Sequence, residues 1–210
     1  MAKPVSDSPV FSLRAVQGGS SIAFWWERIL SSQLEVDGYD IILIHLGVID
    51  ILRAIASSEN VLPLHIVPRL GSLIEAIRIF NSHAYIVVSA VIPVVDRKLW
   101  YQGVEPMRRA VNTGFARLCA QFHNVAFFKT FDRFLKFNHP VIDYFQEDGL
   151  HLSQAGADIL LPWFHQIISI PTIVEQLNSN ERARLGKLIA TDIVLDNTIY
   201  KSPRFLACLY

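Results

Sequence analysis

Residues Tyr39–Gly47 read Y-D-I-I-L-I-H-L-G, a run of apolar and β-branched side chains with little polar interruption. A strand has this composition when helices cover both faces of its sheet, because neither face then meets water. Gly47 ends the run and provides a place for the chain to turn. We therefore expect this stretch to be a central strand of a parallel sheet.

Strand and helix patterns alternate on both sides of that run. Upstream, Phe11–Val16 can form a short strand, and G-G-S-S then leads into the helical pattern I-A-F-W-W-E-R-I-L. Downstream, the alternation continues with a helix, a strand, a helix and a short strand, at residues 63–80, 84–93, about 106–122 and 124–129. This order predicts an α/β fold of three layers, with a doubly wound, mostly parallel sheet between helices.

The pattern changes after Ile170. Residues 171–190 suggest one or two further helices, and residues 192–210 have no clear periodicity. We expect a main domain at residues 11–170, a short N-terminal segment at residues 1–10 and a helical extension at residues 171–210.

The composition excludes several classes of protein. Of 210 residues, 51% are hydrophobic and 18% charged, and Lys+Arg equals Asp+Glu at 19 each, which suits one compact domain without a strong field of either sign. No basic run indicates a nucleic-acid patch, and no apolar stretch has the length of a membrane span. The first residues lack the apolar core of a signal peptide, and Cys119 and Cys208 have no metal or redox spacing. We expect an intracellular protein that uses no metal and no cofactor.

The segment E-D-G-L-H-L-S holds the best candidate for chemistry. Asp148 and His151 stand three residues apart, and Gly149 allows a tight turn between them. A carboxylate that accepts one ring N–H orients a histidine as a base. The alternative is structural: Ser153 caps a helix, and His151 is a half-buried ring.

Three segments resemble a known family. D-G-L-H-L-S-Q-A-G-A-D-I-L resembles the last block of the SGNH, or GDSL-type, hydrolases, and Y-D-I-I-L-I-H-L-G-V-I-D resembles their third block, a strand ending in Gly-x-Asn-Asp. R-A-V-Q-G-G-S-S-I is similar to the second block. The similarity extends over about Ser12–Ile168. The chain also resembles the SGNH-like domains of animal retroelement proteins.

The resemblance implies hydrolysis of a small ester or acetylated substrate. His151 would then be the general base and Asp148 its orienting partner. Gly19, or else Gly18, would offer a backbone N–H to the oxyanion, and Asp50 would match the structural Asp of the third block.

Two parts of the family pattern fail. Ile49 stands where the family has its oxyanion Asn, and the first block, a strand ending in Gly-Asp-Ser, is not found. The only similarity to that block is S-D-S, which ends at Ser8. This is either a chance match or the remnant of the block after its connection was shortened. Ser20 and Ser21 are substitute nucleophiles, although a serine in this place is typical of a helix cap.

Two interpretations therefore stay open. The chain is either an active serine esterase or a catalytically inactive, truncated or degenerate relative that serves as a binding or interaction module. A sheet without its usual first strand would have exposed edges, so partner binding or self-association is expected in that case.

Other polar residues have simpler interpretations. We expect His45 to be a core or near-core histidine and Ser89 a packing residue. Arg108, Arg109 and Arg117 are expected to form a solvated helix face.

Overall fold

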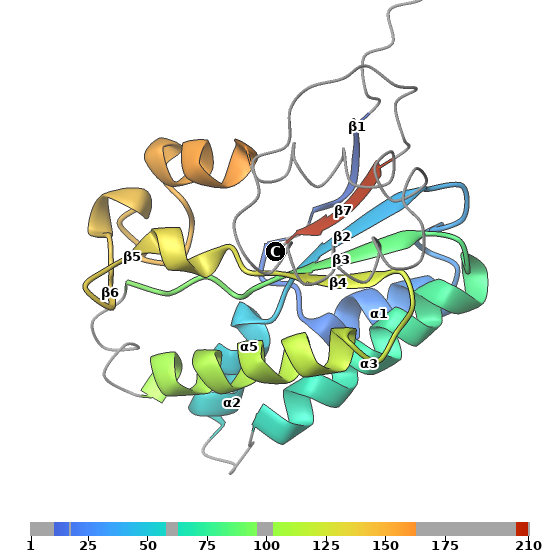
Figure 1. The fold of residues 1–210 in the computed structure, drawn as a ribbon, viewed down its shortest axis with the longest axis horizontal. Coiled ribbons are helices and arrows are strands. Elements are labelled where there is room, and N and C mark those ends of the chain that lie inside the picture. The colour runs from blue at the N-terminus through green and yellow to red at the C-terminus, as the bar shows by residue number, and fades with distance from the viewer. Residues whose placement is uncertain (1–10, 17, 58–62, 96–102, 163–204, 210) are drawn as a thin grey trace, which may run out of the picture.

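The computed structural model describes residues 11–16, 18–57, 63–95, 103–162 and 205–209. Its centre is a parallel five-stranded sheet, and Figure 1 shows helices gathered on one side of it. The strands, in spatial order, are β1 (Phe11–Val16), β7 (Phe205–Leu209), β2 (Ile41–His45), β3 (Tyr85–Ser89) and β4 (Val125–Phe128). The helices are α1 (Ile22–Leu30), α2 (Val48–Ala56), α3 (Pro63–Phe80) and α5 (Glu105–Cys119). The predicted α/β fold with a parallel sheet is confirmed.

The strand beside β2 comes from the far end of the sequence. β7 pairs in parallel with both neighbours, so that Leu209 lies opposite Val16 on one side and His45 on the other. The described strands therefore leave no open edge between β1 and β2. A short apolar run such as F-L-A-C-L cannot be assigned to strand or helix from periodicity alone.

The predicted segments at the two ends of the chain are only partly described. Residues 205–209 of the expected helical extension form a strand of the main sheet. Residues 171–204 and the N-terminal segment 1–10 lie outside the described residues.

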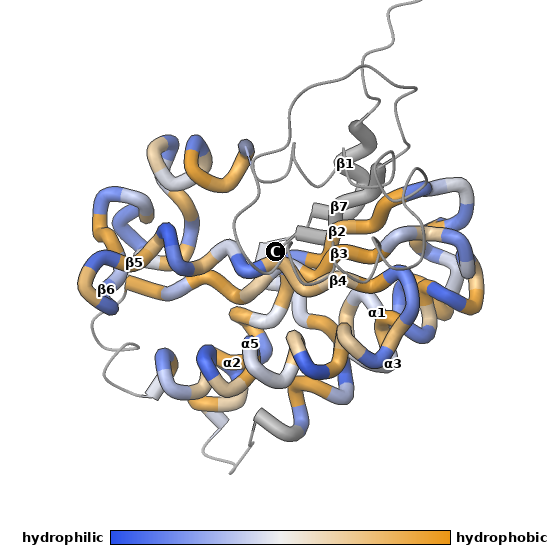
Figure 2. Tube along the Cα trace, viewed as in Figure 1, coloured by the Kyte–Doolittle hydropathy of each residue, from blue (hydrophilic) through white to orange (hydrophobic). Residues whose placement is uncertain are grey.

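The core lies between the sheet and the four helices. All five side chains of β2 are buried, as are four of the five in β3, and Figure 2 shows both strands as mainly hydrophobic. Buried residues of α3, spaced three or four apart, belong to the same hydrophobic cluster as these strands, including Ile66, Leu70 and Ile77. The near-continuous apolar run that predicted a central strand follows from this burial.

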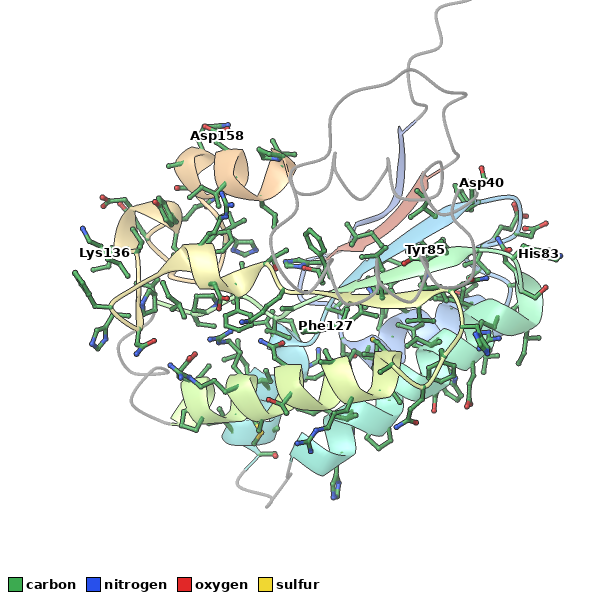
Figure 3. The ribbon with its side chains drawn as sticks, in the orientation of Figure 1. Asp40, His83, Tyr85, Phe127, Lys136 and Asp158 are labelled. Atoms are coloured by element: carbon green, nitrogen blue, oxygen red, sulfur yellow. The ribbon has the colours of Figure 1, made fainter. Side chains whose placement is uncertain are left out.

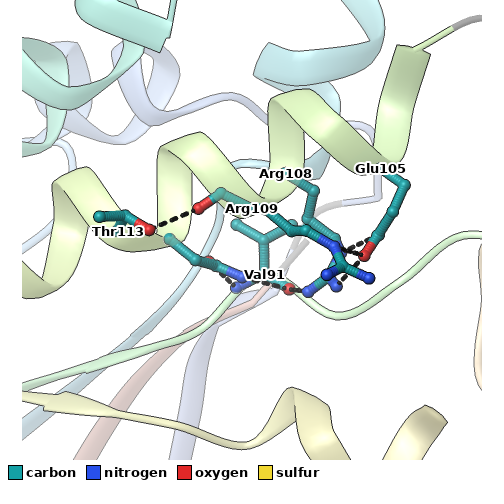
Figure 4. Close-up of polar contacts among 6 residues, drawn as sticks. Val91, Glu105, Arg108, Arg109 and Thr113 are labelled. Atoms are coloured by element: carbon teal, nitrogen blue, oxygen red, sulfur yellow. Dashed lines mark hydrogen bonds and ion pairs between the residues drawn. The ribbon is translucent and has the colours of Figure 1, made fainter. Parts of the chain in front are cut away.

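A buried polar clamp holds the chain where it leaves β3 (Figure 4). Asn112 accepts a hydrogen bond from the Val91 N–H (2.9 Å) and donates one to the Val91 carbonyl (3.0 Å), which also accepts from Arg108 Nη1 (2.9 Å). Glu105 receives two further hydrogen bonds from Arg108, at 2.6 and 2.7 Å. The prediction of a solvated face is wrong for Arg108, because its charge is paired inside the protein, whereas Arg117 is exposed.

Two smaller elements follow β4. A short hairpin joins β5 (Leu135–Lys136) to β6 (His139–Pro140), and a helix begins at residue 154 and is described as far as residue 162. No helix in the described part of the chain is long and apolar enough to cross a membrane.

The place of β7 can be tested with proline. Ala207→Pro should destabilise the fold by at least about 1–3 kcal/mol, because proline takes a backbone donor out of a central strand. Ala207→Ser keeps that donor and is the control. Urea unfolding followed by circular dichroism measures both variants, and equal midpoints would contradict a central place for β7.

Candidate active site

The segment that carries Asp148 and His151 is a tight, hydrogen-bonded turn. Phe145 and Leu152 form an antiparallel bridge, and Gln146 N–H donates to the carbonyl of His151 (2.8 Å). Gly149 has φ of 69°, a conformation that favours glycine. Its carbonyl accepts from Val95 N–H (2.8 Å), which connects the turn to the chain beyond β3.

Asp148 and His151 are in direct contact. His151 Nδ1 lies 2.5 Å from Asp148 Oδ2, and Asp148 Oδ1 accepts the backbone N–H groups of Leu150 and His151, both at 2.9 Å. These hydrogen bonds, with that of the His151 ring the largest cause, lower the pKa of Asp148 to about 2. An ionised carboxylate only accepts, so Nδ1 carries the proton and Nε2 is the ring nitrogen available as a base. Both side chains are about half exposed.

The helix that follows is capped as the alternative interpretation expects. Ser153 Oγ accepts from Gly156 N–H (3.2 Å) and donates to the Asp143 carbonyl (2.6 Å). The cap and the Asp148–His151 pair therefore occur together, and the first does not exclude the second.

The glycine loop before α1 is the second part of the candidate site. Gly18 and Gly19 are exposed, and Gly19 has φ of 74°. Ser21 is the N-cap of α1 and accepts from Phe24 N–H (3.3 Å), as expected for a helix cap. Ser20 is buried, and its hydroxyl oxygen accepts a hydrogen bond from the Trp25 indole (2.9 Å).

Asp50 holds the end of this loop through a hydrogen bond. Its Oδ2 accepts the N–H of Ile22, the first residue of α1, at 3.0 Å, and Arg69 lies 3.7 Å from Oδ1. Burial raises the pKa of Asp50, while the Ile22 hydrogen bond and Arg69 oppose that shift. Asp50 thus connects the start of α2 to the end of the glycine loop.

Ile49 lies in the first turn of α2, partly buried and packed against the core. Its side chain has no hydrogen-bond donor. The preceding Gly47 has φ of 117°, and a Cβ there would come within 2.9 Å of the Val91 side chain, so only glycine suits this position.

The predicted site residues form two groups. Asp148 and His151 make one, and Gly18, Gly19, Ser20 and Asp50 make the other. Within the described residues, neither Ser20 nor Ser21 hydrogen-bonds to His151. Ser8 lies outside the described residues.

A buried chain of polar side chains at the ends of β2 and β3 was not predicted. His45 Nδ1 lies 2.9 Å from Ser89 Oγ, which lies 3.1 Å from Thr130 Oγ1. Ser89 is fully buried, so this serine and histidine link neighbouring strands and do not meet a substrate. The signal was a polar residue at the last position of two neighbouring apolar strands.

A cavity of about 510 Å³ adjoins the turn. Its lining includes Val95, Asp143, Phe145, Glu147 and Asp148. The described residues contain no cluster of His, Cys, Asp or Glu that could hold a metal ion.

The comparisons with known proteins agree with the fold. The family model described as GDSL-like Lipase/Acylhydrolase matches residues 5–159. The lipase/acylhydrolase from Enterococcus faecalis is similar in structure, with TM-score 0.56, 17% identity and 71% of each chain covered. A carbohydrate esterase of family 3 from Talaromyces cellulolyticus gives TM-score 0.55 and 15% identity over 76% of this chain and 70% of its own.

A Streptococcus pneumonia protein named for platelet activating factor gives TM-score 0.55 and 24% identity. The match covers 68% of the present chain and 65% of the bacterial one, so the present chain spans less than two thirds of that relative. The search of curated proteins finds no significant match.

The buried histidine predicts an acid-sensitive fold. Burial lowers the pKa of His45 from 6.5 to about 4. As pH falls, the unfolded chain binds a proton at His45 before the folded protein does. The free energy of unfolding is therefore fully retained above pH 6.5 and decreases as pH falls toward 4, by up to roughly 3 kcal/mol. His45→Gln should reduce the dependence of the unfolding free energy on pH between 6.5 and 4.5, measured by urea titration. If His45→Gln and the original protein showed the same dependence of unfolding free energy on pH, His45 would not be the source of the acid sensitivity.

Proposed function

This chain belongs to the GDSL-like lipase/acylhydrolase family, and we propose that it hydrolyses small carboxylic esters, acetyl esters among them. The observation that carries the proposal is the contact between His151 and an ionised Asp148 on an exposed turn. A histidine held in one tautomer by a carboxylate is the arrangement that acyl transfer requires of its base.

In the proposed reaction a serine hydroxyl attacks the ester carbonyl while His151 Nε2 takes its proton. The backbone N–H of Gly19 donates to the oxyanion of the tetrahedral intermediate, with Gly18 as the alternative donor. The protonated His151 then gives its proton to the departing alcohol. Water attacks the acyl-serine in the same manner, which releases the acid and restores the hydroxyl.

Two serines are candidates for the nucleophile. Ser20 follows the glycine loop, and although its oxygen accepts from Trp25, its own proton is still available for donation. Ser8 precedes β1. Labelling with a fluorophosphonate, followed by peptide mass spectrometry, distinguishes the two, since only an activated serine forms the adduct.

A second candidate function is a non-hydrolytic binding module of the same fold. It is favoured by Ile49, which cannot complete an oxyanion hole, and by the burial of Ser20. Absence of both labelling and turnover in a folded protein would support this candidate.

Substitutions of the pair test the proposed hydrolysis. His151→Ala and Asp148→Asn should each lower kcat for p-nitrophenyl acetate by about two to four orders of magnitude, because the first removes the base and the second its orienting acceptor. The control is His123→Ala, at an exposed histidine beyond α5. Wild-type turnover in His151→Ala would refute the assignment of the base.

The missing oxyanion donor predicts a gain of function. Ile49→Asn should raise kcat by about 10- to 100-fold, because the loss of one oxyanion-hole donor from an enzyme costs roughly two to three orders of magnitude in kcat. Ile49→Val is the control for altered packing. An asparagine variant no faster than the valine variant would show that this position does not face the oxyanion.

A further inference from the structure

A second cavity, separate from the catalytic turn, lies between α5 and the segment that follows β4. It has a volume of about 600 Å³ and shares no lining residue with the cavity beside Asp148. A volume of this order suits a small ligand. We propose that this groove, called the α5 groove below, binds a small organic anion that has a flat aromatic body.

The charge of the α5 groove is positive. Arg109, Arg117 and Lys129 line it, and Asp132 is the one acidic residue in its lining. Glu105 pairs with Arg109 (2.7 Å) and with the buried Arg108, while Asp132 pairs with Lys129 (2.9 Å). The lining itself thus holds three cations and one carboxylate.

Arg117 is the cation best placed to recruit a ligand. It is exposed, it lines the groove, and among the described residues it forms no ion pair. A guanidinium presents paired N–H donors to a phosphate or carboxylate, which a single ammonium does not.

Aromatic side chains form the apolar part of the α5 groove. Phe127, on the edge strand β4, and Phe131 are both partly exposed, and Figure 3 shows Phe127 at the side of the sheet that faces α5. Arg108 Cζ lies 4.8 Å from the centre of the Phe131 ring, and Lys129 Nζ lies 5.4 Å from it. Aromatic and cationic groups side by side suit a ligand that combines a ring with an acid.

The α5 side of the groove is held by buried hydrogen bonds. Asn112 and Arg108 anchor α5 to the Val91 backbone, and Figure 4 shows the contact of Arg108. Leu135 and Asn138 of the β5–β6 hairpin also line the groove. A wall that is already held in place reduces the entropy that binding would otherwise cost.

The two cavities differ in sign. Asp143, Glu147 and Asp148 line the cavity at the catalytic turn, so that cavity repels an anion. The α5 groove attracts one, so an anionic ligand is expected in the groove and not in the cavity at the turn.

The test is isothermal titration calorimetry of the full chain with phenyl phosphate, inorganic phosphate and benzyl alcohol. Phenyl phosphate should bind with Kd of about 0.1–1 mM, and at least about tenfold more tightly than either fragment, because only it uses both parts of the groove. Salt at about 0.5 M should weaken the binding of phenyl phosphate, because it screens the attraction between the phosphate and the cationic side chains.

Two variants localise the binding. Arg117→Gln and Lys129→Gln should each weaken phenyl phosphate by about fivefold or more. The matched control, Arg78→Gln, changes a partly exposed arginine of α3 and should bind as the original protein does. His151→Ala should also bind normally, so this result is independent of whether the chain hydrolyses esters.

The proposal would be overturned by any of three results. These are no saturable binding of phenyl phosphate up to about 10 mM, unchanged affinity in Arg117→Gln, or equal weakening in Arg78→Gln. Circular dichroism confirms that each variant is folded.

Discussion

The pairing of β7 with both β1 and β2 is the constraint on which the rest of the sheet depends. Without β7, β1 would have no neighbour in the sheet, and the glycine loop that follows β1 would lose its support. Both groups of candidate site residues are attached to this sheet, one through β1 and the other through the chain beyond β3. The place of the glycine loop thus depends on pairing with a strand from the far end of the sequence.

Local features of the structure could be predicted from the sequence, and non-local ones could not. The apolar run at residues 41–45, the cap at Ser21 and the pair at residues 148 and 151 depend on neighbours within a few positions, so their patterns were sufficient. The place of β7 depends on residues more than 150 positions away, and a five-residue apolar run does not specify its partners. Arg108 was assigned to the surface because its burial depends on the Val91 carbonyl, which lies outside its helix, although its other partner, Glu105, lies three positions before it on the same helix.

Two aspartates illustrate how surroundings decide the chemistry of one side chain. Asp148 is exposed and accepts three hydrogen bonds, which lower its pKa. Asp50 is buried, and desolvation raises its pKa. The sequence placed both near the site, but only the folded environment separates a partner for a histidine from a support for a loop.

The origin of β7 also sets the timing of folding during synthesis. A ribosome adds about 5–20 residues per second, so β2 emerges roughly 8–30 s before β7 does. During that interval β1 and β2 lack the strand that will separate them, and their backbone groups can pair with other chains. The protein therefore depends on protection of its nascent chain more than a fold whose central strands emerge together.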